Sequence, residues 1–452
     1  MPSHPGKEDG WDSPRREKMK ETKVYAISLG CPKNRVDAEA MLGSIPGGMR
    51  AVDAPHEADL VLINTCSFIR PAVEESLDAI LEMIETLRDL SPRPLLAVTG
   101  CLPGRYGEDL KKDLPEVDFW GVPSELSLWS RRIGQALHRE EQARSGRPGR
   151  AVSTAPGFAY MKISDGCDHA CNYCTIPSIR GPLKSESVDG LVAEAEAVLA
   201  TGRKELVLTA QDLTAYGRDL KDGTNLLRLV EKLAALPGLK WLRLMYLYPS
   251  GLTPSFLSAL RDVGPPLLPY FDIPFQHVHP DVLKAMGRPK SADAETVTAR
   301  VREAFPGAAI RTTFIVGHPG ETEARFQALY DFVARAKLDH VGVFPYYPED
   351  GTPSAAVKSR VSMKEKLRRQ EAIMGLQQTI SAKKLAARVG EELDVLVDAP
   401  HPEWDGLYLG RTWFQAPEAD GVTYVSGPGV FPGKLVKASV IEARDYDLTA
   451  LV

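Results

Sequence analysis

The chain lacks three features, and each absence excludes a class of protein. No apolar run reaches the roughly 18 residues that a membrane-spanning helix needs. The first twenty residues are polar and mixed in charge, without the apolar centre of a signal peptide. Basic residues are not in excess, since 55 Lys and Arg stand against 60 Asp and Glu, so no overall positive field attracts nucleic acid. We therefore expect a cytoplasmic globular protein without membrane contact.

Cysteine is also scarce, with six in 452 residues. Disulfides are rare in the cytoplasm, and the six cysteines fall into two groups of three. Two metal clusters explain this grouping better than three disulfides or six inert thiols do. The disulfide and inert-thiol alternatives weigh more for the first group, whose members are widely spaced. The groups are Cys31, Cys66 and Cys101, then Cys167, Cys171 and Cys174.

The second group occupies one short loop. It follows an apolar run at 158–163 that predicts a strand, and then a turn at 164–166. Gaps of three and two residues between the cysteines let their sulfurs converge on one inorganic centre. A zinc site usually takes four ligands, and no fourth cysteine or nearby histidine pair completes one. Three thiolates on a cubane iron–sulfur cluster leave one iron open. This spacing resembles that of radical S-adenosylmethionine (SAM) enzymes.

The first group recurs at equivalent places in an alternating strand and helix pattern. Strands are predicted at 23–29, 59–64 and 94–99, and a cysteine follows each one. The carboxyl ends of parallel strands lie at one edge of a sheet. Residues far apart in sequence can therefore meet there, which favours a second cluster over three unrelated buried thiols.

Composition and periodicity divide the chain into segments of mixed α/β class. The amino-terminal pattern predicts an open α/β domain with a parallel sheet. Six further strands separated by helices predict a partial (β/α)6 barrel of the TIM type, with its chemistry at the carboxyl ends of the strands. Short strands at 393–397, 406–410, 422–425 and 435–440 predict a small antiparallel, OB-like barrel. The predicted segments are a disordered tail at 1–20, the amino-terminal domain at 21–138, a linker at 139–156, the core at 157–388 and the terminal barrel at 389–452.

The charge of the terminal barrel opposes a role in nucleic-acid binding. Residues 391–452 hold eleven acidic residues against four basic ones. A surface that follows phosphates needs Lys and Arg, so an acidic barrel is better suited to a basic protein partner.

The order of these domains resembles that of the radical SAM methylthiotransferases. Four stretches resemble the branch that modifies an aspartate of a ribosomal protein rather than a tRNA adenosine. One departure is His318, where the family usually has Phe. The stretches are 30–37 (GCPKNRVD), 246–249 (YLYP), 270–277 (YFDIPFQH) and 411–421 (RTWFQAPEADG).

The resemblance implies two 4Fe–4S clusters, one on each cysteine group, with SAM as radical source and methyl donor. It implies a methylthio group placed on the β-carbon of an aspartate in small-subunit ribosomal protein twelve. An electron donor such as flavodoxin or ferredoxin would be a second partner, and we expect no direct binding of nucleic acid. No catalytic residue is assigned beyond the clusters.

The resemblance also implies four residues that contact SAM. Tyr173 is expected over the adenine, with core packing as the alternative. Gln211, Asp212 and Arg311 are expected at the methionine and ribose groups, with hydrogen bonding at the strand ends as the alternative. Two other functions remain: methylthiolation of a tRNA adenosine, and a non-catalytic RNA- or ribosome-binding protein with a structural metal.

Overall fold

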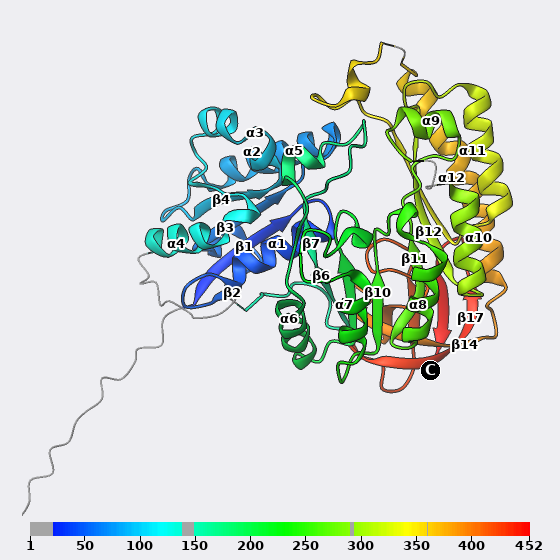
Figure 1. Ribbon diagram of the computed structural model, residues 1–452. Helices are drawn as coiled ribbons and strands as arrows, with labels where there is room; N and C mark the ends of the chain where they lie inside the picture. Colours follow the sequence, from blue (N-terminus) through cyan, green and yellow to red (C-terminus); the bar gives the residue numbers. More distant parts are fainter. Residues whose placement is uncertain (1–20, 138–148, 290–292, 359) are drawn as a thin grey trace, which may run out of the picture.

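The computed structural model of the chain describes residues 21–137, 149–289, 293–358 and 360–452 (Figure 1). The predicted tail at 1–20 and residues 139–148 of the predicted linker lie outside the described residues.

The amino-terminal domain is a parallel sheet with the strand order β2-β1-β3-β4-β5. All six residues of β3 are buried, as expected where helices cover both faces of a parallel sheet. The strands are β1 (Thr22–Ser28), β2 (Met49–Ala51), β3 (Leu60–Thr65), β4 (Leu95–Gly100) and β5 (Phe119–Trp120). The helices are α1 (Pro32–Gly43), α2 (Arg70–Leu87), α3 (Cys101–Asp113) and α4 (Leu126–Ala136).

The central domain is a six-stranded parallel sheet with the order β13-β12-β11-β10-β9-β6. Each new strand is added beside the previous one, as in part of a TIM barrel. The strands are β6 (Phe158–Lys162), β9 (Glu205–Thr209), β10 (Trp241–Leu244), β11 (Leu267–Asp272), β12 (Ala309–Val316) and β13 (His340–Pro345), and a small ribbon is formed by β7 (Ser164–Asp165) and β8 (Lys184–Ser185).

Helices connect the strands of the central sheet and pack their apolar faces against it. The last helix begins with a side-chain N-cap, because the Ser362 side chain accepts from the backbone N–H of Glu365. The helices are α5 (Ile176–Arg180), α6 (Val188–Ala200), α7 (Leu226–Ala234), α8 (Pro254–Val263), α9 (Pro280–Ala285), α10 (Ala294–Ala304), α11 (Glu323–Ala336) and α12 (Met363–Ala386).

The terminal domain is a closed five-stranded barrel, which confirms the predicted fold class. One detail differs, because β16 and β18 pair in parallel and β18 was not predicted. This strand has only four residues and follows an acidic turn, so its alternation of apolar and polar residues is too short to recognise. The strands are β14 (Glu392–Pro400), β15 (Leu407–Arg411), β16 (Thr423–Ser426), β17 (Leu435–Ala443) and β18 (Leu448–Leu451).

The terminal barrel shares a hydrophobic core with the central sheet (Figure 1). Phe414 and Ala416 pack in one cluster with Tyr160 of β6 and Tyr270 of β11. The Tyr160 hydroxyl also donates to the carbonyl of Pro417 at 2.9 Å. The segment 411–420, which resembles the family's terminal barrel, therefore holds the two domains together.

Candidate functional site

The first cysteine group lies at one edge of the amino-terminal sheet. The sheet order makes β1, β3 and β4 direct neighbours. Cys31 is the N-cap of α1, Cys66 directly follows β3, and Cys101 opens α3 directly after β4. Gly30 has a φ of +91°, and a Cβ there would lie 2.9 Å from the Cβ of Cys66. Only glycine lets the Cys31 loop approach Cys66 this closely.

The second group lies in the loop between β7 and α5. Backbone hydrogen bonds fix this loop, from the Cys167 N–H to the Gly181 carbonyl at 3.1 Å and from the Asn172 N–H to the Met286 carbonyl at 3.0 Å. Gly287 has a φ of +72°, and a Cβ there would lie 2.7 Å from the carbonyl oxygen of Ala170. The chain after α9 therefore passes directly under the cysteine loop.

The donor chemistry of both groups fits iron–sulfur clusters. All six cysteines are free thiols. Burial, together with the neighbouring Cys101 and Cys31, raises the pKa of Cys66 to about 11. Burial likewise raises the pKa of Cys174 to about 12, helped by Cys171 and Cys167. The members of each group are therefore close together, and metal binding must displace their protons.

The ligand type of both groups suits a cluster. In the described part of the chain, no three His, Cys, Asp or Glu side chains converge on one metal ion. Thiolates on a cubane bind different iron atoms, so they need not converge on one point. Soft thiolate ligands suit iron–sulfur clusters.

Two buried amide oxygens lie at the carboxyl ends of the central strands. Gln211 follows β9 and donates to the Asp165 carboxylate at 2.8 Å, but its Oε1 has no partner. Gln276 follows β11 with a φ of +70°, and its Oε1 also lacks a partner. A buried polar atom without a partner is costly, so both oxygens are suited to a polar ligand at this edge.

The predicted contact Asp212 is fully engaged at its strand end. Its Oδ1 accepts from the Thr214 N–H at 2.8 Å, and its Oδ2 lies 2.7 Å from the Nε2 of His169. His169 stacks on Tyr248 at 3.9 Å, and Arg288 lies 4.1 Å from the centre of the same ring. This stack was not predicted, because its members come from three separate loops.

A small pocket of about 150 Å³ opens beside this stack. Its lining includes Cys167, His169 and Asp212. The second cysteine group therefore borders a space that a small ligand group can enter.

Tyr173 lies inside the cysteine loop as expected. Burial raises its pKa well above the ordinary value, and the thiols of Cys171 and Cys174 add to this. Its ring meets the imidazole of His318 edge-on at 6.5 Å. His318 in turn meets Tyr346 edge-on at 5.1 Å and lies 2.9 Å from the Ser354 hydroxyl. The imidazole thus packs as an aromatic ring where the family has Phe.

The fourth predicted SAM contact, Arg311, pairs with the terminal barrel. It is the third residue of β12 and lies beside Asp272, the last residue of β11, with its Nε 3.6 Å from the Asp272 carboxylate. Its guanidinium also binds Asp420 of the terminal barrel and the carbonyl of Ala419. Arg311 therefore lies level with the carboxyl end of β11, and a direct contact with SAM stays a prediction.

One junction between the amino-terminal and central domains joins the two cysteine groups. The Thr175 hydroxyl donates to the carbonyl of Phe68 at 3.3 Å, and these residues closely follow Cys174 and Cys66. The Arg180 guanidinium, at the end of α5, donates to Asp37 at 2.6 Å. Arg180 was not predicted, because an arginine before a glycine gives no signal of its own in the sequence.

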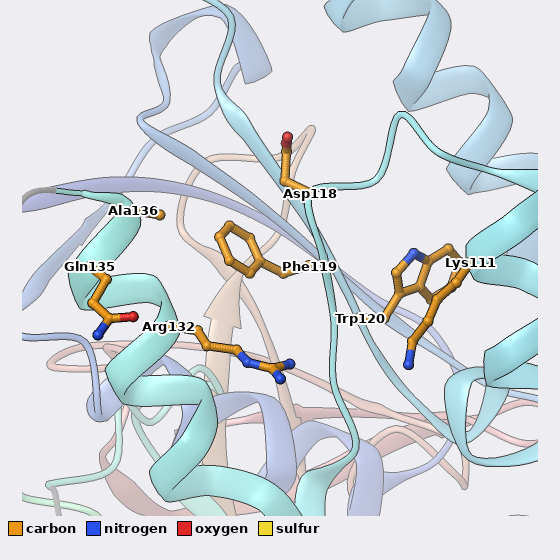
Figure 2. A pocket seen from close by; sticks show the side chains of 7 residues that line it. All are labelled: Lys111, Asp118, Phe119, Trp120, Arg132, Gln135 and Ala136. Atoms are coloured by element: carbon orange, nitrogen blue, oxygen red, sulfur yellow. The ribbon is translucent and has the colours of Figure 1, made fainter.

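A larger pocket of about 590 Å³ lies away from this junction. Figure 2 shows its walls, with Phe119 and Trp120 of β5 on one side and Arg132 and Gln135 of α4 on the other. None of the six cysteines lines it, so we assign it no part in the chemistry.

Comparison with known protein families agrees with the three domains. The uncharacterized protein family UPF0004 matches residues 23–121, the Radical SAM superfamily matches 161–333, and the TRAM domain matches 389–452. In the described part of the chain, every helix is too short or too polar to cross a membrane.

Relatives match almost the whole chain. The Ribosomal protein uS12 methylthiotransferase RimO of Nitratidesulfovibrio vulgaris (strain DP4) is 53% identical over 95% of this chain and 99% of its own. The protein of that name from Syntrophus aciditrophicus (strain SB) is 41% identical over 96% of this chain and 99% of its own. Among solved structures, the radical SAM methyltransferase TsrM from Kitasatospora setae, with tryptophan and a SAM analogue bound, gives a TM-score of 0.53 at 16% identity. It covers 86% of this chain and 78% of its own, and this likeness shows the fold alone.

Proposed function

This chain belongs to the RimO family of radical SAM methylthiotransferases, and from that membership we propose that it adds a methylthio group to the β-carbon of an aspartate in ribosomal protein uS12. The family uses SAM and 4Fe–4S clusters, which are the expected cofactors. The observation that carries the proposal is the pair of cysteine triplets on two sides of one domain junction, each group suited to a cluster with an open iron.

The two cysteine groups are proposed to have different roles. Cys167, Cys171 and Cys174 would hold the cluster that binds SAM, and Cys31, Cys66 and Cys101 would hold an auxiliary cluster. When bound, these groups supply the electron that cleaves SAM to a radical and the sulfur that joins the substrate carbon. Because hydrogen would have to be removed from an unactivated carbon, the chain would have to keep that carbon, the bound SAM and the auxiliary cluster together in a site without water.

Residues at the carboxyl edge of the central sheet would position SAM. The free Oε1 atoms of Gln211 and Gln276 are acceptors for its ammonium or hydroxyl groups. Tyr173 supplies an aromatic surface within the cysteine loop. Asp212 forms a hydrogen bond with His169, a residue of the loop that holds the second cysteine group, and so orients the His169 ring. Arg311 acts from the side of the terminal barrel, where its pair with Asp420 fixes the domain that meets the partner.

The acidic terminal barrel is the surface proposed for the ribosomal protein. Its balance of eleven acidic to four basic residues complements a basic partner and opposes direct contact with RNA. A flavodoxin or ferredoxin is the proposed electron donor, and the reducing cytoplasm is the proposed location, because all six thiols are free.

A single reaction tests this function. The reconstituted enzyme is incubated anaerobically with SAM, a reductant and purified uS12, and mass spectrometry is expected to find one methylthio addition on an aspartate. A parallel incubation with tRNA tests the rival, which predicts modification of an adenosine. Modification of tRNA alone would replace the proposal, and about one zinc with no acid-labile sulfide would support a non-catalytic metal protein.

A further inference from the structure

Lys33 is a buried lysine without an anionic partner at the junction between the domains. It is the second residue of α1 and lies two positions after Cys31. Its side chain is 8% exposed, and its Nζ lies 3.6 Å from the centre of the Tyr246 ring. Within the described ranges, the ammonium makes no hydrogen bond or ion pair with another residue.

Two other lysines with little exposure have hydrogen-bond or ion-pair partners. Lys162 pairs with Asp37 and with Asp165. Lys366 also lies over a tyrosine ring, at 5.1 Å from the centre of Tyr346, but its Nζ donates to the carbonyl of that residue. A cation–π contact does not replace an anionic partner for a buried ammonium. Lys33 therefore remains available to bind an anion.

The ring below Lys33 is held in place by a strained backbone. Tyr246 has a φ of +61°, a left-handed conformation that residues other than glycine rarely adopt. Its N–H donates to the Asp272 carboxylate at 3.0 Å, and its carbonyl accepts from the Leu213 N–H at 3.0 Å. Two strand ends of the central sheet thus fix the ring, and the ring fixes the ammonium.

Asp272 is not an ion-pair partner of the Lys33 ammonium. One of its oxygens accepts from Tyr246, and the other lies 3.6 Å from the Nε of Arg311. Lys33 is close enough to both Cys31 and Asp272 to feel their charge. It therefore stands between the auxiliary cysteines and the carboxyl edge of the central sheet, where the proposed function requires the reacting carbon to lie.

On the basis of that proposed function, we propose that the Lys33 ammonium binds the side-chain carboxylate of the substrate aspartate. The carboxylate supplies the missing anion and the hydrogen-bond acceptors. The reacting β-carbon is bonded directly to the carboxyl carbon, so this contact places it beside the Cys31 loop. It also makes Lys33 the residue that selects aspartate over asparagine, because an amide brings no charge to compensate the buried ammonium.

Binding without turnover tests this role. The full-length reconstituted enzyme, without SAM or reductant, is titrated with purified uS12 and with uS12 that carries Asn at the modified position. A charge-assisted contact predicts that the wild type prefers the aspartate form by about tenfold to hundredfold. Lys33→Met should reduce this preference to near one, and Lys33→Arg should retain most of it. The matched control is Lys366→Met, which removes a compensated buried lysine over a tyrosine and should leave the preference unchanged.

The outcomes separate this inference from the proposed function. If wild-type enzyme methylthiolates uS12 and Lys33→Met keeps the full aspartate preference, the role of Lys33 is wrong while the function stands. If wild-type enzyme does not modify uS12 under turnover, the function fails and the inference falls with it. Iron content and melting temperature are measured for every variant, and Lys33→Gln, which keeps a polar side chain of similar length, carries the same test if Lys33→Met does not fold.

Discussion

The Nη2 of Arg180 lies 3.4 Å from the Sγ of Cys101, although the two residues belong to different domains. Arg180 ends the helix that follows the second cysteine group, and Cys101 belongs to the first. The same guanidinium donates to Asp37 at 2.6 Å and to Asp165 at 3.1 Å, and its side chain is only 6% exposed. One buried cation therefore joins both cysteine groups, and their relative position depends on it.

Removal of the Arg180 guanidinium should destabilise the junction between the amino-terminal and central domains. Arg180→Gln leaves Lys162 as the described cation that pairs with Asp37 and Asp165, so we expect the free energy of unfolding to fall by about 3–5 kcal/mol in denaturant titrations. The control is Arg335→Gln, because the Arg335–Glu295 pair is 62% exposed on both sides and should contribute nothing measurable. Equal effects of the two substitutions would contradict a structural role for Arg180.

Each cysteine group should hold its own cluster. Wild-type enzyme assembled anaerobically should contain about eight iron atoms per chain. Replacing Cys31, Cys66 and Cys101 with Ala should halve iron and acid-labile sulfide, abolish methylthiolation and leave reductive cleavage of SAM to 5′-deoxyadenosine.

The reciprocal variant separates the two roles. Replacing Cys167, Cys171 and Cys174 with Ala should also halve the iron but abolish SAM cleavage. Retention of all the iron by either variant would show that its cysteines are not ligands.

The cysteine groups could be predicted because their members follow predicted strands. This prediction depends only on the order of strands and helices along the chain. Cys66 and Cys101 follow neighbouring parallel strands, and any parallel sheet brings such residues to one edge. Gln211 was found in the same way. These predictions needed the order of strands and helices, but not the packing of one domain on another.

The contacts that the sequence did not predict depend on domain packing. The contact of Arg311 with SAM stays a prediction, but its pairing with Asp420 of the terminal barrel, more than a hundred residues later, was not predicted. Lys33 was part of a recognised motif, yet the absence of a partner for its ammonium is visible only in three dimensions. Charge pairing across domains leaves no periodic pattern in a sequence.

The buried carboxylate of Asp420 should hold the terminal barrel on the central sheet. It accepts from the Tyr270 hydroxyl at 2.7 Å and from the Ala416 N–H at 2.8 Å, and it pairs with Arg311 and His340. Asp420→Asn weakens these contacts in a site without solvent, so we expect a loss of about 3–5 kcal/mol at neutral pH. Asp262→Asn, at a side chain that is 71% exposed, is the control.

The pH dependence of this loss follows from the pKa of Asp420. Burial raises that pKa, but His340, Arg311 and the hydrogen bonds lower it more, so the net shift is downward. A lowered carboxyl pKa contributes stability above the unfolded value of about 4, and this stability disappears as the pH falls through the folded value. The difference between wild type and Asp420→Asn should therefore be constant near neutrality and shrink below about pH 4. A difference that is independent of pH would contradict the ionised state of Asp420.

His318 should behave as a neutral aromatic residue near neutral pH. Burial is the main reason that its pKa falls from 6.5 to about 4. A histidine with a lowered pKa binds its proton more readily in the unfolded chain, so it costs no stability above pH 6.5 and progressively destabilises the fold as the pH falls toward 4. His318→Phe removes this proton uptake, and wild type should lose about 2 kcal/mol more than the variant between pH 7 and pH 5.

Ser354→Ala separates the titration from the hydrogen bond. This variant removes the hydroxyl that lies 2.9 Å from the Nε2 of His318 but keeps the imidazole. It should therefore be less stable than wild type at every pH, with a pH dependence that follows wild type rather than His318→Phe. Denaturant unfolding of the three proteins at pH 7, 6 and 5 checks this, because acid loss of the clusters affects all three equally. If His318→Phe loses stability with acid as steeply as wild type does, the imidazole does not titrate in the buried position, and its packing between Tyr173 and Tyr346 does not explain how it replaces Phe.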